Sequence, residues 1–389
     1  MDKCSQELVK GFLKTENKKI VNMNGDEILL RGVGIGNWLL PEGYMWQFNT
    51  VKNTTRADRP RRIEQLLVEL TGKEYAEKFW KTFQRDYFSE KDIAAIAEAG
   101  FNSIRIAINY RMLMEDGPEI VWLEDGFKLI DDCLDCCEKY SVYAVLDLHG
   151  APGGQTGANI DDCIDDMPRL FMDKDSYQKT IALWKELATR YKDRFIVAAY
   201  DLLNEPLQPL HAAYKNQLMD FYTDVIKEIR AIDAKHMLSI EGSHWATNTE
   251  IFERFYDDNM LIHFHRYWCP PEEHVYTEFL ELSEKCNAPL WLGESGENTL
   301  EWYGAMFPLA IQLNVSWNYW PFKRIITQKP TICEIKTPKN WEQILAYLDG
   351  APHPGFKESQ KIFDEYLQNI KFENVNYRTE VVDALLGCI

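Results

Sequence analysis

Short apolar runs alternate with amphipathic stretches along most of this 389-residue chain. Runs that are apolar and bulky enough for buried strands lie at 31–38, 102–108, 143–148, 197–203, 237–241, 260–267, 289–294 and 315–320. Apolar residues recur with helical spacing over 61–99 (with a break near 87–89), 126–140, 175–192, 211–232, 271–286, 299–312 and 356–370. Strands that alternate with helices indicate an α/β protein with a parallel sheet. Eight such units, without an internal repeat or low-complexity linker, predict a single (β/α)8 barrel over residues 1–389.

The segments outside this alternation predict additions to the barrel. Residues 11–30 contain two short strands around Asn24-Gly25, a strong hairpin signal, and we expect this N-terminal segment (1–30) to close the bottom of the barrel. Residues 39–60 form a long irregular insertion, which is typical of a functional loop or lid. Residues 331–389 predict a C-terminal loop and a closing helix.

Composition narrows the possible partners. The formal net charge of −18 argues against nucleic acid and anionic membranes, whereas neutral sugars are indifferent to it. Twelve Trp and nineteen Tyr suit carbohydrate binding, because flat rings cover the apolar faces of sugars. The start of the chain lacks the apolar core of a signal peptide, and the nine cysteines have no framework spacing. We therefore expect a cytoplasmic protein with reduced thiols, or a secreted one if a signal peptide has been removed.

Two glutamates follow predicted strands directly. Asn204-Glu205-Pro206 ends the fourth strand and Gly293-Glu294 ends the seventh. In a (β/α)8 barrel both positions lie at the carboxyl-terminal face, where chemistry takes place. Retaining glycoside hydrolysis needs two such carboxyl groups, one as acid/base and one as nucleophile. The alternative is that both are turn sequences that happen to carry Glu, but their position at two strand ends favours a catalytic pair.

The second strand carries Arg105 inside an apolar run. A buried Arg is rarely tolerated without a partner, and a carboxylate nucleophile at Glu294 would be a natural one. Such a pair would keep Glu294 ionised, while Glu205 must hold its proton near neutral pH. A structural carboxylate, Asp86 or Asp92, is the alternative partner.

Histidines end the third and sixth strands. His149 could bind a sugar hydroxyl or could form hydrogen bonds only within its own loop, and we favour the first interpretation. His263, His265 and Tyr267 share one face of the sixth strand, because strand side chains alternate. A His-x-His pair can bind a metal, but metal-dependent barrel hydrolases carry theirs on the first strand. We therefore expect no metal and no cofactor, with Tyr267 bonded to the nucleophile and His265 to a sugar hydroxyl.

The eighth strand ends in aromatic residues. Trp320 is placed to form a stacking floor for the sugar, whereas Trp317 has the opposite parity and should pack under the helices. The alternative is that both indoles belong to the core.

The motifs together resemble the exo-β-1,3-glucanase-like branch of glycoside hydrolase family 5. The resemblance lies in RGVGIGNWLL (31–40), the stretch 72–110, DLHGAPGGQTG (147–157), LLNEPL (202–207), HFHRYW (263–268), LGES (292–295) and SWNYWPFK (316–323). It implies Glu205 as acid/base and Glu294 as nucleophile. It also implies a set of residues around the sugar in the −1 subsite: Arg105, His149, Asn204, His265, Tyr267 and Trp320. Asn204 would bond the 2-hydroxyl of this sugar.

Two departures from that branch leave the linkage open. The fungal exo-glucanases have an Asn-Gly-Phe stretch where this chain has residues 156–160, and the usual aromatic after the nucleophile is replaced in residues 295–298. We expect a retaining β-glucosidase or exo-β-1,3-glucanase acting on a small carbohydrate by double displacement. The alternatives are a family 5 enzyme of other specificity (an endo-β-glucanase, or a glycosidase for an apolar aglycone such as a glycolipid) and a non-catalytic carbohydrate-binding barrel. The oligomeric state is not indicated.

Overall fold

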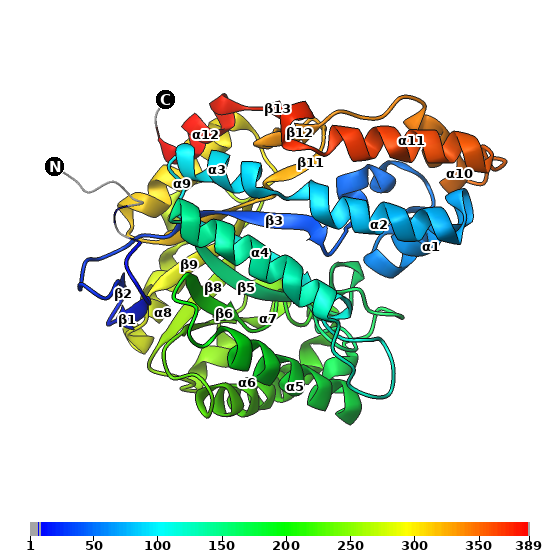
Figure 1. Cartoon of the computed structure of the whole chain (residues 1–389). Coiled ribbons are helices and arrows are strands. Elements are labelled where there is room, and N and C mark those ends of the chain that lie inside the picture. The colour runs from blue at the N-terminus through cyan, green and yellow to red at the C-terminus, as the bar shows by residue number, and fades with distance from the viewer. Residues whose placement is uncertain (1–6, 8, 388–389) are drawn as a thin grey trace.

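A closed barrel of eight parallel strands forms the centre of the protein, as the computed structural model shows for residue 7 and residues 9–387 (Figure 1). This confirms the predicted (β/α)8 barrel. The strands are β3 (Arg31–Leu39), β4 (Ser103–Asn109), β5 (Tyr143–Gly150), β6 (Val197–Asp201), β7 (Met237–Glu241), β8 (Met260–His265), β9 (Leu290–Gly296) and β10 (Ser316–Trp320). Each strand pairs in parallel with the next, and β10 closes the ring on β3.

Amphipathic helices surround the barrel and bury their apolar stripes. They are α1 (Pro60–Thr71), α2 (Lys73–Tyr87), α3 (Glu90–Glu98), α4 (Glu124–Tyr140), α5 (Lys174–Tyr191), α6 (Lys215–Arg230), α8 (Thr277–Cys286) and α9 (Leu300–Gln312). Helix α1 buries its stripe mainly against neighbouring helices. The stretch 61–99 is three helices, because Gly72 with φ +84° separates α1 from α2. A capping box between Ser89 and Asp92 starts α3.

The N-terminal hairpin forms one turn earlier than predicted. Strands β1 (Lys14–Glu16) and β2 (Lys19–Val21) pair across Asn17–Lys18, not across Asn24–Gly25. The later turn is closed by a single bridge between Val21 and Glu27. The Asn22 carboxamide oxygen accepts from the backbone N–H of Asn24 and of Asp26, and this local bonding replaces a longer ladder.

The segment that includes the hairpin lies at the amino-terminal ends of the strands. Tyr143, the first residue of β5, donates its hydroxyl to the Gly11 carbonyl, and Thr15 on β1 bonds Asn259, just before β8. In Figure 1 the hairpin lies at the end of the barrel from which the β3 arrow points away.

The C-terminal region contains more structure than the expected loop and single helix. It holds α10 (Trp341–Leu348), α11 (Phe356–Asn369), α12 (Thr379–Leu386) and a small sheet of β11 (Lys323–Ile325), β12 (Cys333–Ile335) and β13 (Asn376–Tyr377). Strands of two or three residues and helices of eight give too short a pattern for periodicity to detect.

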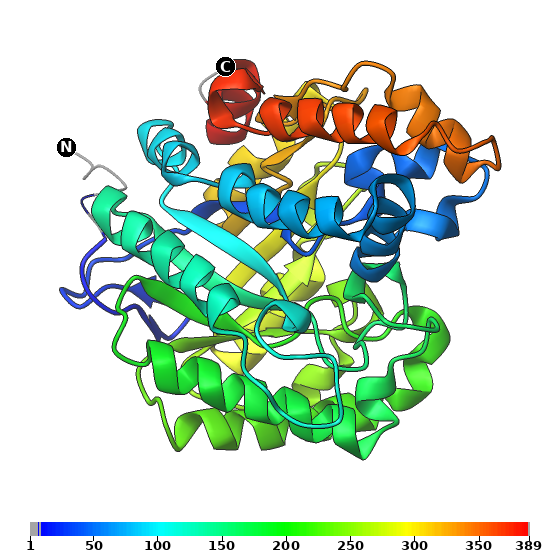
Figure 2. The same cartoon turned by 45° about the vertical axis from the view of Figure 1, so that its right-hand side comes forward.

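Helix α11 lies along α1 and α2 (Figure 2), and its Tyr366 packs against Trp46 and stacks on Phe79. Trp46 belongs to the 39–60 insertion, which folds as the 3₁₀ turns η2 (Gly43–Trp46), η3 (Phe48–Thr50) and η4 (Thr54–Ala57). The C-terminal helices therefore hold the insertion against the barrel. Among the described residues, no helix has both the length and the apolar character needed to cross a membrane.

Candidate active site

A cavity of about 470 Å³ opens at the carboxyl-terminal end of the barrel. Six of the eight predicted site residues line it: His149, Glu205, His265, Tyr267, Glu294 and Trp320. The other two, Arg105 and Asn204, are fully buried and bonded to each other at 2.8 Å, where they contact lining residues. The structure thus brings all eight side chains to one place.

The floor of the cavity is formed by buried side chains at the carboxyl-terminal ends of the strands. Arg105 on β4 is the cation at the centre of this floor. Its guanidinium bonds Glu294 at 2.5 Å and Asp201 at 2.8 Å, and it lies 3.1 Å from both Asp147 and Glu241. The predicted pairing of Arg105 with Glu294 is confirmed. These acidic side chains are nearly inaccessible to solvent, and one cation cannot neutralise all of them. Burial accordingly raises the pKa of Asp147 and Glu241 well above the ordinary range.

Glu294 is held from two sides. Its Oε1 accepts from Arg105, and its Oε2 accepts from the Tyr267 hydroxyl at 2.9 Å, as predicted. Tyr267 lies just beyond β8, which ends at His265, so the expected strand is two residues too long. An oxygen of Glu294 and an oxygen of Glu205 lie within 4.8 Å of each other.

Glu205 follows β6 in a left-handed conformation, with φ +44°. Its backbone N–H donates to Glu241 Oε2 at 2.6 Å, its carbonyl accepts from the Thr156 hydroxyl at 2.7 Å, and its side chain contacts His265 Nδ1 at 2.7 Å. Burial raises the pKa of Glu205 to about 7, against the opposing effects of His149 and Arg105. This carboxyl group is therefore largely protonated below neutral pH.

The histidines of the floor are neutral near pH 7. Burial lowers the pKa of His149 to about 4. Its Nε2 accepts a hydrogen bond from the Asn204 side-chain amino group at 3.2 Å, and its Nδ1 therefore carries the proton and donates to Asp147 at 2.7 Å. Burial also lowers the pKa of His263 and His265, whose Nε2 atoms lie 3.0 Å apart.

Trp320 lies flat in the floor. Its ring stacks parallel to His149, with the centroids 5.3 Å apart, and its indole N–H donates to the Tyr44 hydroxyl at 2.9 Å. The glycines of β3 make room for it, because a Cβ at Gly34 or Gly36 would come within 2.3 or 2.6 Å of the indole. Trp317 instead packs against Phe101 and Phe307, as its parity predicts.

Two overlapping groups of described residues bring metal-ligating atoms within 4.8 Å of one another: Glu241, His263 and His265, and Glu205, His265 and Glu294. In the first group, the two Nε2 atoms already face each other and Glu241 bonds Arg105. In the second, Glu205 and His265 are bonded to each other, and Arg105 adds a positive charge beside Glu294. The absence of a metal requirement stays a prediction.

Sequence reasoning missed five acidic residues at the site: Glu42, Asp147, Asp201, Glu241 and Glu297. An acid within a buried strand is itself a signal, so Asp201 and Glu241 could have been found. Glu42 lies on the irregular insertion, where no pattern indicates its direction. It lines the cavity with Oε1 buried and without a hydrogen-bond partner in the described structure, and burial raises its pKa well above normal.

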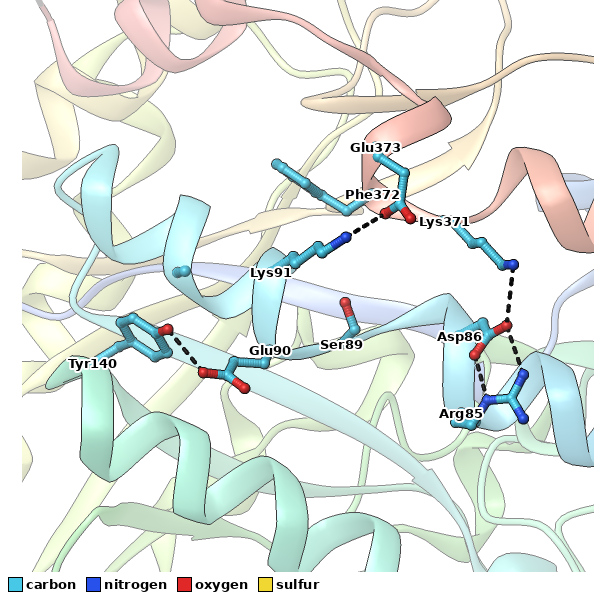
Figure 3. Close-up of a pocket in the computed structure, with 10 residues that line it drawn as sticks. Arg85, Asp86, Ser89, Glu90, Lys91, Tyr140, Lys371, Phe372 and Glu373 are labelled. Atoms are coloured by element: carbon cyan, nitrogen blue, oxygen red, sulfur yellow. Dashed lines mark hydrogen bonds and ion pairs between the residues drawn. The ribbon is translucent and has the colours of Figure 1, made fainter.

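A second hollow, of about 570 Å³, lies on the outside of the barrel beside α2, α3 and α4 (Figure 3). Its charged residues mostly pair among themselves, as in Lys91–Glu373 and Arg85–Asp86. Nothing in its lining points to chemistry.

An eight-stranded barrel with two facing carboxyl groups at strand ends has the architecture of the (β/α)8 glycoside hydrolases. Residues 68–324 match the model of the cellulase family, glycosyl hydrolase family 5, and the chain belongs to this family.

Individual relatives carry several activities in their names. The chain is 34% identical over 241 residues to a β-xylosidase of Phanerodontia chrysosporium, covering 62% of this chain and 48% of the relative. It is 30% identical over 216 residues to a glucan 1,3-β-glucosidase of Candida oleophila, covering 52% and 48%. The solved endoglucanase Cel5A of Thermotoga maritima shares the fold, with a TM-score of 0.52 at 20% identity over 67% of this chain and 89% of that one. The chain spans about half the length of the curated relatives it matches.

Proposed function

We propose that this protein is a retaining glycoside hydrolase that cleaves the β-glucosidic bonds of small oligosaccharides or glucosides. One observation carries the proposal: an oxygen of Glu205 and an oxygen of Glu294 lie within 4.8 Å of each other, while Glu205 has a raised pKa and Glu294 is bonded to Arg105. Retaining enzymes place these groups about 5–5.5 Å apart, whereas inverting enzymes leave about 6.5–9.5 Å for a water.

The two carboxyl groups act in two steps. Protonated Glu205 gives its proton to the glycosidic oxygen while the bond from C1 to that oxygen breaks and Glu294 bonds to C1. Glu205 then takes a proton from a water molecule, whose oxygen attacks C1 and releases Glu294. The sugar leaves with its β configuration, and no cofactor is needed.

The polar wall of the cavity supports binding of one terminal sugar. Trp320 offers a flat apolar face, and Asn204 Nδ2 has a second hydrogen for the 2-hydroxyl after its contact with His149. Glu42 and Glu297 add carboxyl oxygens on the side of β3 and β9, suited to sugar hydroxyls. A cavity of this size lies within the range of small-ligand pockets, about 300–1,000 Å³, which favours small substrates and exo action. We also propose that the enzyme works in the cytoplasm, since the seven described cysteines are free thiols.

The test is hydrolysis of aryl β-glycosides and of laminari- and cello-oligosaccharides by the wild type and by Glu294→Ala. We expect cleavage of β-glucosides with net retention at C1, measured by NMR, and a rate at least about 10⁴-fold lower in the variant. Net inversion would overturn the mechanism. A folded wild type that binds sugars and cleaves none would indicate a binding protein instead.

A further inference from the structure

The two sides of the cavity differ in chemistry. Glu42, Tyr44 and Glu297 line the side of β3 and β9. The opposite side, on the loops after β5 and β7, presents Ala158–Ile160 and Trp245. Glu205 belongs to this second side, because its carbonyl bonds Thr156 on the loop after β5. An acid that protonates the leaving oxygen must face the leaving group, so the aglycone lies against this apolar side.

The loop that carries Trp245 is tied directly to the Glu205 loop. The backbone N–H of His244 donates to the Leu207 carbonyl at 2.7 Å, two residues beyond Glu205. Leu207 and Gln208 in turn bond the backbone of residues 155 and 156. Three loops thus form one hydrogen-bonded unit around the acid, and Trp245 extends from it over the cavity mouth.

The backbone at this point is unusual. His244, Trp245 and Ala246 have φ of +57°, +56° and +58°, a left-handed conformation that non-glycine residues rarely adopt singly and almost never in succession. Ala246 is buried beneath the turn, while Trp245 remains 40% exposed. Strained backbone that persists with an exposed indole at a cavity mouth points to a role in binding.

The groups around Trp245 offer few hydrogen bonds. The Thr247 hydroxyl donates within the turn to the His244 carbonyl, so its proton is already used. Ala158 and Ile160 contribute only aliphatic side chains, and Asn159 between them adds a single carboxamide. A second sugar would present hydroxyls that this surface satisfies poorly, whereas an apolar alcohol would lose nothing by burial here.

We propose that the leaving-group side of the cavity selects β-glucosides with an apolar aglycone, an aryl or alkyl alcohol, and that Trp245 is its main contact. The inference rests on the proposed function. In the first step the departing group is this alcohol, which takes the Glu205 proton as its bond to C1 breaks.

The test is kcat/KM for alkyl β-glucosides from methyl to octyl, for an aryl β-glucoside and for laminaribiose and cellobiose. In the wild type we expect a rise of up to about fourfold for each methylene that becomes buried. Trp245→Ala should lower kcat/KM for octyl and aryl glucosides about ten- to a hundredfold and lower it far less for methyl glucoside. Trp245→Phe should retain most of the preference.

Phe255→Ala is the matched control, because Phe255 is 71% exposed and does not line the cavity. Its kinetics should equal those of the wild type. Inhibition by octyl β-thioglucoside provides a second readout: its Ki should rise in Trp245→Ala and not in the control. The inference would be overturned if kcat/KM did not change from methyl to octyl glucoside, or if the wild type preferred disaccharides and Trp245→Ala abolished that preference. Either result would leave the proposed glycosidase function intact. No cleavage of any substrate would overturn the proposed function itself.

Discussion

The buried floor of the cavity and its exposed rim, which carries Trp245 and Trp268, differ in how their side chains are held in place. On the floor, Arg105 contacts four carboxyl groups, and the strands fix each partner's position. On the rim, Trp245 and Trp268 are 40% and 67% exposed and depend on loop backbone for their placement. The difference separates two tasks. A buried network sets protonation states for the chemistry, and a partly exposed apolar surface selects the leaving group. Substitutions on the floor should therefore affect folding and every substrate, and those on the rim only some substrates.

The largest effect is expected from Arg105→Met. Removing the cation leaves buried carboxylates without compensation, which typically costs about 3–5 kcal/mol. We expect the free energy of unfolding, measured in urea, to fall by this amount, together with loss of activity on all substrates. Arg194→Met is the control, because Arg194 pairs with Asp135 and Glu138 at the surface, and such pairs contribute about 0–1 kcal/mol. Equal losses in the two variants would contradict a central role for the floor network.

Glu241→Gln should separate positioning from folding. Glu241 accepts the Glu205 N–H at Oε2 and Arg105 at Oε1. Because Arg105 also bonds Glu294, Glu241 connects the two carboxyl groups of the proposed mechanism. A Gln keeps one acceptor and loses the other, and displacements of this kind can cost about 10² in rate. We expect kcat to fall by roughly that factor, with KM nearly unchanged and a smaller loss of stability than in Arg105→Met. The exposed Glu253→Gln should behave as wild type; a Glu241→Gln effect on KM alone would refute positioning.

The floor could largely be predicted from the sequence and the rim could not. Glu205, Glu294, Arg105 and Trp320 follow from two regularities: side chains alternate along strands, and the carboxyl ends of parallel strands meet. Trp245 depends on a hydrogen bond from His244 to Leu207, 37 residues earlier in the sequence, and on left-handed backbone angles that His, Trp and Ala do not favour.

Contacts between distant parts of the chain and unusual backbone angles also explain why other features of the site could not be predicted. Glu42 sits on an irregular insertion held in place by the C-terminal helices, so its direction depends on contacts between distant parts of the chain. The left-handed φ of Glu205 is also invisible in sequence, because that region is usually occupied by Gly or Asn.

The pH dependence of kcat/KM should be set by the floor residues and not by the rim. Burial raises the pKa of Glu205 to about 7, and the proposed acid must be protonated to act. As the pH rises through 7 the proton is lost, so kcat/KM for alkyl glucosides should fall about tenfold per pH unit above that point. An aryl glucoside with a very acidic leaving group needs little protonation, and its alkaline limb should be shallower. Trp245→Ala should leave the midpoint where it is; a shift in that variant would mean that floor and rim are coupled.

The smallest effect is expected from Trp268→Ala. Its ring lies beside Tyr267 and under the Lys329 ammonium at 5.3 Å, but two-thirds of it is exposed to solvent. An exposed cation–π contact contributes about 0.5–1 kcal/mol, so the free energy of unfolding should change by no more than that. Hydrolysis of methyl β-glucoside should also be unchanged, because Tyr267 still bonds Glu294. If this variant loses activity on methyl glucoside, the rim at β8 supports the nucleophile through Tyr267, and the division between floor and rim fails at that point.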